Sequence, residues 1–188
     1  MAAVTRGDQA PAGNPSPVLY WPVIDLAAVF ADPKQVAAQL AGGAELYGLR
    51  SADVGLVTPQ LMVLQLELAP WAALADEGYP IERVAVFIWV DGRIAAVPDA
   101  ARARLWLHRQ PPPLGELCLW ALHDPPGLQW HWSDGLVAYI SIVHRHLQAE
   151  EYWRRTGSWP AEDAPHGSLP QPVRTAAMKA AADRWRRP

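Results

Sequence analysis

Cysteine is almost absent from this sequence: Cys118 is the single thiol in 188 residues. One cysteine cannot form a disulfide within its own chain, and disulfide frameworks are typical of secreted proteins rather than of reducing compartments. We therefore expect a cytoplasmic protein. Any thiol chemistry in this chain must use Cys118.

Long hydrophobic runs and an excess of positive charge are also missing. The formal net charge is −3, which argues against a protein that binds nucleic acid by neutralising phosphates. Charged residues or prolines interrupt every apolar stretch before it reaches the roughly 20 residues that span a bilayer. The opening residues, "MAAVTRGDQAPAGNPSPV", contain no apolar signal-peptide core. We expect neither nucleic acid nor a membrane as a partner.

Signatures of phosphate and metal binding are absent as well. The chain has no Walker A motif and no dinucleotide fingerprint, so we expect it not to activate a carboxyl group with ATP by itself. His144 and His146 stand two residues apart in a predicted helix, point to different faces and make a poor chelate. Together with His131 and His166 they are interpreted as scattered, solvated histidines. We predict no metal and no cofactor.

The composition that remains is that of a globular protein. Hydrophobic residues make up 51% of the chain and charged residues 19%, and a chain of this length suits one domain with one core. Residues 1–17, rich in proline, glycine and alanine, predict a flexible leader. Residues 18–170 form the predicted domain, and 171–188 a basic helical tail.

Hydrophobic periodicity predicts helices and antiparallel strands in the rest of the chain. We expect first a helix over 32–49, with Asp32 as N-cap and an interruption at Gly42 and Gly43, then a strand-rich run over 55–71 and a hairpin over 82–97 turning at Asp91 and Gly92. A half-exposed strand over 102–108, an ordered proline-rich loop over 111–127, and a long helix from Ser133 or Asp134 to Gly157 follow. This order predicts an α+β fold in which helices pack on one side of an antiparallel meander.

The long helix shows an apolar face and a charged face. The predicted apolar face consists of Leu136, Ile140, Val143, Leu147 and Tyr152. Glu150 and Arg154 stand four residues apart, as do Glu151 and Arg155, a spacing that allows ion pairs along a helix surface. We interpret these four residues as a solvated face.

The segment "HRQPPPLGELCLW", residues 108–120, carries the cysteine. Three consecutive prolines restrict the backbone, and Gly115 permits a turn that a side chain would disfavour. Gln110 can donate through its amide, and His108 can donate or accept. Leu117 and Leu119 flank Cys118 with apolar bulk, so that local chemistry leaves two interpretations open: a buried structural cysteine or a nucleophile.

The spacing of this segment resembles the active site of the ubiquitin-conjugating enzymes. His108, Gln110 and Gly115 stand ten, eight and three residues before Cys118, in the pattern "HRQ....GELCL". The family's segment reads His-Pro-Asn, then a glycine, an aliphatic residue, the cysteine and often a leucine. Downstream, "EEYWRRTGSW" resembles divergent bacterial members of the family. The resemblance covers roughly residues 100–167.

The resemblance implies a fold, an activity and a set of partners. It implies the ubiquitin-conjugating-enzyme-like fold, with an N-terminal helix, a meander sheet, a cysteine-bearing loop and a long helix after it. Cys118 is then expected to receive an acyl group as a thioester from an adenylating activating enzyme. The acyl group is the C-terminus of a ubiquitin-like protein or of a CBASS-type nucleotidyltransferase, and it passes to an amine on a target protein. The implied context is bacterial antiphage defence.

The resemblance also implies roles for individual residues. Gln110 replaces the family's asparagine and Arg109 its proline, so Gln110 is the expected oxyanion donor beside His108 and Cys118. His123 and Asp124 are the nearest groups that could accept a proton from an attacking lysine.

The role of three tryptophans and the function of the protein as a whole each keep alternatives. Trp120, with Trp130 and Trp132, could form a wall beside the thiol or belong to the core. A non-catalytic binding module with a buried Cys118, and a cysteine hydrolase that pairs Cys118 with His108 or His123, remain alternatives.

Overall fold

A computed structural model describes residues 23–42, 48–99, 104–120 and 129–160. Its elements are, in chain order, α1 (Leu26–Ala31), α2 (Pro33–Gly42), β1 (Leu49–Val57), β2 (Leu61–Leu68), α3 (Ala72–Asp76), β3 (Glu82–Trp89), β4 (Ile94–Pro98), the 3-10 turn η3 (Trp132–Asp134) and α4 (Gly135–Thr156). The predicted α+β class and the antiparallel meander are confirmed, since the four strands pair in the order β1-β2-β3-β4. The leader, the tail, His123, Asp124 and His166 lie outside the described residues.

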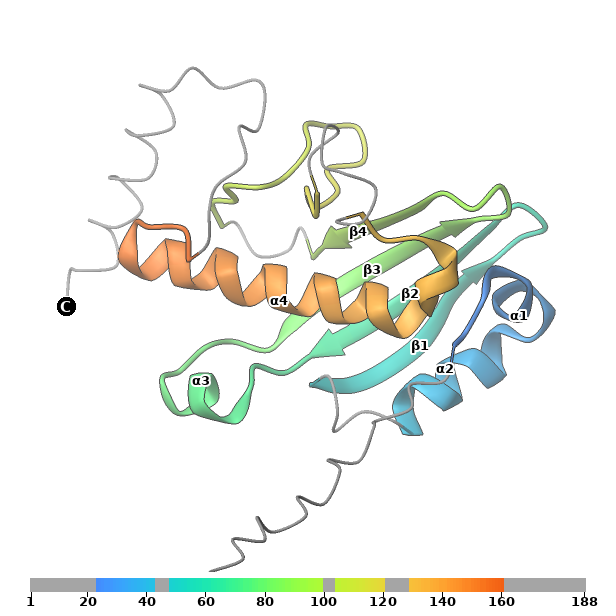
Figure 1. Ribbon diagram of the computed structural model, residues 1–188, viewed down its shortest axis with the longest axis horizontal. Coiled ribbons are helices and arrows are strands. Elements are labelled where there is room, and N and C mark those ends of the chain that lie inside the picture. The colour runs from blue at the N-terminus through green and yellow to red at the C-terminus, as the bar shows by residue number, and fades with distance from the viewer. Residues whose placement is uncertain (1–22, 43–47, 100–103, 121–128, 161–188) are drawn as a thin grey trace, which may run out of the picture.

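The core lies between the sheet and α4, which crosses one face of it (Figure 1). Alternate residues of β2 and β3 are buried, as a strand with one covered face requires, and they pair in register, for example Leu64 with Val86. From α4, Ile140, Val143 and Leu147 join the same apolar cluster. Burial of these side chains is the main force that holds the helix on the sheet.

The hairpin predicted over 82–97 is confirmed and the apolar run before it is divided. β3 and β4 meet at Asp91 and Gly92, where Gly92 has a φ of 88°. The run 55–71 splits into the end of β1 and the whole of β2, because Thr58 accepts backbone N–H bonds from Gln60 and Leu61 and closes a turn. The sequence signal was correct for strand but missed this turn.

The helix predicted over 32–49 is confirmed in its first part, up to the interruption expected at Gly42 and Gly43. Asp32 does cap it, since the side chain accepts a hydrogen bond from the Gln35 N–H. However, α2 ends at Gly42 and β1 already begins at Leu49. A separate turn of helix, α1, precedes it and was not predicted.

The strand predicted over 102–108 is wrong for the part of it that the structure describes. Residues 104–108 are irregular, and an isolated bridge joins Arg109 to Leu117. The physical reason is that the backbone N–H groups of Leu107 and His108 bind the Glu150 carboxylate instead of a neighbouring strand.

The long helix is confirmed at its C-terminal end and corrected in two details. Gly157 ends α4 in the left-handed region, with a φ of 76°, as a C-terminal glycine is expected to do. The helix starts at Gly135, after η3, and the Asp134 side chain binds the His131 N–H rather than capping α4. Tyr152 is 40% exposed, and Trp153 is buried in its place.

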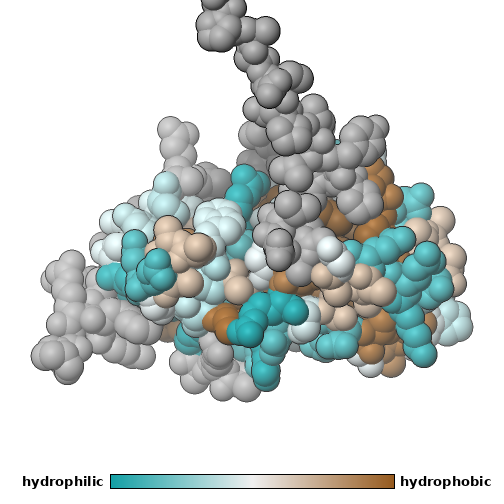
Figure 2. Space-filling model, turned by 90° about the horizontal axis from the view of Figure 1, so that it is seen from below, coloured by the Kyte–Doolittle hydropathy of each residue, from teal (hydrophilic) through white to brown (hydrophobic). Residues whose placement is uncertain are grey.

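Figure 2 shows one face of the molecule, on which apolar and polar groups alternate in small patches. Among the residues that the structure describes, no helix is both long enough and apolar enough to cross a bilayer.

Candidate functional site

The cysteine segment folds back on itself and brings Gln110 to the thiol. The Cys118 N–H donates to the His108 carbonyl at 2.9 Å, and the Gln110 N–H donates to the Glu116 carbonyl at 2.8 Å. This antiparallel closure places the Gln110 amide nitrogen, Nε2, 3.2 Å from Cys118 Sγ. The structure therefore brings these two side chains together.

Gly115 and Arg109 stabilise the turn of this segment. Gly115 has a φ of 67°, a conformation that disfavours side chains, and Arg109 Nε donates to its carbonyl oxygen at 2.6 Å. A Cβ at this position would lie 2.8 Å from an Arg109 guanidinium nitrogen. The predicted need for glycine has two causes, the backbone angle and the arginine packed over it.

Replacing Gly115 with alanine is expected to disturb the site more than the same change at Gly78. Both glycines have positive φ, which costs an alanine about 1–2 kcal/mol. A Cβ at Gly78 meets no atom within 4 Å, whereas at Gly115 it forces Arg109 to move. Urea unfolding should show similar stability losses for the two variants. The rate at which iodoacetamide alkylates Cys118 should change only in Gly115→Ala. Equal thiol rates in the two variants would contradict this prediction.

Cys118 is partly exposed and lines a pocket of about 170 Å³. The other walls include Ile94, Gln110, Glu116, Trp120 and Tyr139. Burial, with a smaller contribution from the negative charge of Glu116, raises the pKa of Tyr139. Its phenol therefore stays protonated and can donate a hydrogen bond but cannot act as a base near neutral pH. Cys118 is therefore not fully buried, and it borders this pocket.

The three tryptophans that the sequence left open take different positions. Trp120 lines the thiol pocket and packs edge-on against Tyr139. Trp130 is buried, and its indole N–H donates to the Gly135 carbonyl at 3.0 Å. Trp132 is partly buried and donates to the Gly92 carbonyl at 2.7 Å. Trp120 is thus a wall of the site, and Trp130 belongs to the core.

The remaining predicted site residues hold the segment in place. His108 is only 2% exposed, and its ring packs against Trp159 and His146. Leu117 is buried, and its N–H donates to the Ala96 carbonyl of β4. Leu119 packs against the core from a partly buried position. We assign His108 a structural contact here, since its ring lies against the C-terminal half of α4 and the segment after it.

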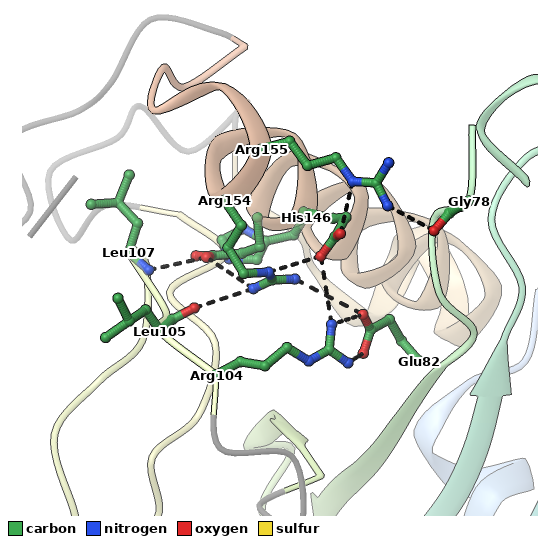
Figure 3. Close-up of polar contacts among 10 residues, drawn as sticks. Gly78, Glu82, Arg104, Leu105, Leu107, His146, Arg154 and Arg155 are labelled. Carbon is green, nitrogen blue, oxygen red and sulfur yellow. Dashed lines mark hydrogen bonds and ion pairs between the residues drawn. The ribbon is translucent and has the colours of Figure 1, made fainter. Parts of the chain in front are cut away.

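Three of the four residues in the charged face predicted for α4 are buried and Arg155 is partly exposed, which corrects the interpretation as a solvated surface. Glu150 is 0% exposed and Arg154 2%. The ion pairs predicted from the spacing are present, at 3.8 Å between Glu150 and Arg154 and 2.8 Å between Glu151 and Arg155. Glu82 from β3 and Arg104 join them, as Figure 3 shows. We call these six residues the charge cluster: Glu82, Arg104, Glu150, Glu151, Arg154 and Arg155.

Sequence reasoning missed Glu82 and Arg104. Arg104 binds Glu82 through two hydrogen bonds, of 2.6 and 2.7 Å, the bidentate geometry that suits arginine. Glu82 lies on the same, buried face of β3 as Val84 and Val86. A carboxylate on a buried strand face needs a cationic partner, and that was the signal available in the sequence.

Two of the histidines interpreted as solvated are enclosed instead. His144 is 1% exposed, with Nε2 2.7 Å from the Ala69 carbonyl oxygen. Burial lowers the pKa of His144 and keeps it neutral. His146 packs close to Glu150 and Trp159, whereas His131 is exposed. Within the described ranges no three histidine, cysteine or acidic side chains gather as metal ligands would.

Comparisons of this chain with models of protein families, with curated proteins and with solved structures give no match. The geometry itself describes a partly exposed thiol on an ordered turn, with an amide donor beside it and an aromatic wall. Such an arrangement suits a sulfur nucleophile whose reaction develops negative charge close to the amide.

Proposed function

We propose that this protein is a ubiquitin-conjugating-enzyme-like acyl carrier that uses Cys118 as its nucleophile. The observation that carries the proposal is the 3.2 Å contact from the Gln110 amide to the sulfur of the partly exposed Cys118. It joins the two residues whose spacing resembles the family's asparagine and cysteine. The element order, with a meander, a cysteine segment and a long helix, is compatible with that family's fold.

The proposed reaction consists of two acyl transfers. In the first, the Cys118 thiolate attacks the carbonyl of a thioester on the activating enzyme, whose own sulfur leaves as a thiolate. In the second, an amine of the target attacks the Cys118 thioester, the Cys118 sulfur leaves as a thiolate, and the proton of the amine passes to water. Both steps pass through an oxyanion, which the Gln110 N–H can stabilise.

The proposed partners follow from this chemistry. An adenylating enzyme supplies the activated acyl group. The acyl donor is the C-terminus of a ubiquitin-like protein or of a CBASS-type nucleotidyltransferase, and the acceptor is a protein amine. We propose antiphage defence as the context, on the resemblance of "HRQ....GELCL" and "EEYWRRTGSW" to bacterial members of the family.

Loading of Cys118 is the direct test of this proposal. The purified activating enzyme, ATP, the modifier and this protein are mixed and resolved on a non-reducing gel. We expect a wild-type adduct that thiols cleave, no adduct for Cys118→Ala, and a thiol-resistant oxyester for Cys118→Ser. The sulfur-to-oxygen change gives the trapped species because an oxyester is a poorer acyl donor than a thioester.

Two other results would replace the proposal. With an activating enzyme and modifier shown to be active together, the lack of any adduct on the wild-type chain would favour the binding module. Cleavage of a preformed conjugate without ATP, lost in Cys118→Ala, would favour the cysteine hydrolase.

A further inference from the structure

We propose that Glu150 is a positioning residue that holds the cysteine segment in its reactive geometry by accepting two backbone N–H groups at its start. Glu150 lies near the C-terminal end of α4, more than thirty residues after Cys118 in the chain, and it is the first residue of "EEYWRRTGSW", to which the resemblance gives no individual role. This inference rests on the proposed role of Cys118 as the nucleophile. It gives Glu150 a role that the resemblance does not supply.

Each oxygen of the Glu150 carboxylate has its own backbone donor. The Leu107 N–H donates to Oε2 at 3.0 Å, and the His108 N–H donates to Oε1 at 2.7 Å. Figure 3 shows the contact to Leu107 beside the charge cluster. These two donors would otherwise need a neighbouring strand, so the side chain takes the place of a strand at this point.

A short path leads from this carboxylate to the thiol. His108, whose N–H binds Glu150, accepts the Cys118 N–H through its carbonyl oxygen at 2.9 Å. Gln110 follows two residues later and donates to the sulfur. A shift of the backbone at His108 therefore moves both the cysteine and its amide donor.

The ionised form of Glu150 is the form that accepts both donors. A protonated carboxyl group has a hydrogen on one oxygen and loses part of its acceptor capacity. Burial raises the pKa of Glu150 to about 7, although the Leu107 and His108 N–H groups and the Arg154 charge lower it in part. Because these N–H bonds favour the carboxylate, binding of the segment and loss of the proton reinforce each other.

Other titratable groups surround this carboxylate, and the test must distinguish their titration from that of Glu150. On α4, His146 Nε2 lies 3.7 Å from Oε1, and an Arg154 guanidinium nitrogen lies 3.8 Å from Oε2. From the cysteine segment, the His108 ring faces His146 with 5.9 Å between the ring centroids. From β3, Glu82 reaches this region through Arg154.

The test measures the rate at which iodoacetamide alkylates Cys118 between pH 5.5 and 9. The single cysteine makes the rate unambiguous, and no partner protein is needed. Besides the ionisation of the thiol, we expect a fall of about tenfold as the pH drops through about 7, which corresponds to one lost hydrogen bond to a charged group. Glu150→Gln is expected to show the lower rate at every pH and no step near pH 7.

Glu151→Gln is the matched control. Glu151 is the next residue, is also buried, and binds Arg104, Arg154 and Arg155 instead of the cysteine segment. This variant should lose stability but keep the step near pH 7. A step that disappears in His146→Gln or His108→Gln and persists in Glu150→Gln would assign the titration to an imidazole and overturn the proposal.

A measurement on the wild-type protein keeps the test valid if a variant does not fold. Hydrogen exchange at the Leu107 and His108 amides, corrected for the intrinsic effect of pH, should show protection at pH 8 that falls about tenfold by pH 6. Unchanged protection would overturn the proposal. A chain that shows the step but never loads an acyl group would contradict the carrier function and leave the role of Glu150 intact.

Discussion

Replacing Arg154 with methionine lowers the free energy of unfolding by about 3–5 kcal/mol, the usual cost of removing one partner from a buried ionic group. Arg154 donates to Glu151 at 2.8 Å and to the Leu105 carbonyl at 3.2 Å, and it lies within 4 Å of Glu82 and Glu150. Methionine retains much of the apolar stem but none of the charge. The buried carboxylates then lose a cation that water cannot replace.

Arg93 provides a closely matched control for this measurement. Arg93 Nε also lies 2.8 Å from a carboxylate, and its guanidinium sits 4.9 Å over the Trp89 ring, as that of Arg154 sits 5.0 Å over Trp106. The side chain of Arg93 is 69% exposed, however. Urea unfolding should therefore show a loss of at most about 1 kcal/mol for Arg93→Met. Similar losses in the two variants would contradict the burial argument.

The loss caused by Arg154→Met should also depend on pH. Arg154 lowers the pKa of Glu150, which burial raises, so its removal raises that pKa further. Glu150 is then neutral at pH 5. At pH 8 it must either stay ionised without its cation or take up a proton, and both lower the free energy of unfolding. The destabilisation should be smaller at pH 5 than at pH 8, since protonation relieves the unpaired charge. A loss that is the same at pH 5 and pH 8 would show that Arg154 acts through packing alone.

The parts of the fold that local patterns determine were predictable. The hairpin at Asp91 and Gly92, the N-cap at Asp32 and the end of α4 at Gly157 each depend on a few neighbouring residues. The meander followed from these elements because short connections join antiparallel neighbours. The strand predicted over 102–108 depended on its alternation alone, and a distant side chain, Glu150, binds the backbone that a strand would have used.

The charge cluster shows the same limit in energetic terms. The spacing of Glu150 and Arg154 predicted an ion pair correctly, but spacing along a helix does not report whether that face is covered. The partners on the covered side include Glu82 and Arg104, which are distant in sequence. At the site, the spacing placed Gln110 at Cys118, whereas the contribution of Tyr139 to the pocket arises from a helix turn that no local pattern connects to the cysteine.

Gln110→Ala is expected to slow transfer of the acyl group from Cys118 to an amine by about 10²–10³-fold, the typical effect of removing one oxyanion donor. Gln110 is exposed, so the free energy of unfolding should change little. The reaction to measure is a single turnover of the preloaded chain with free lysine, so that a slower loading step does not enter the rate.

Asparagine at this position separates the donor from the length of its side chain. Gln110→Asn keeps the amide but shortens its reach by one carbon–carbon bond, while the sulfur lies 3.2 Å from the present Nε2. The backbone bonds between Gln110 and Glu116 and between Cys118 and His108 fix the distance that the side chain must span. If the amide donates to the oxyanion, Gln110→Asn should transfer the acyl group faster than Gln110→Ala. Gln110→Glu should be no faster than Gln110→Ala, because a carboxylate cannot donate. Equal transfer rates for Ala, Asn and the wild type would show that Gln110 only supports the turn. The oxyanion would then need another hydrogen-bond donor in the thiol pocket, and the protonated Tyr139 phenol is one that lines it.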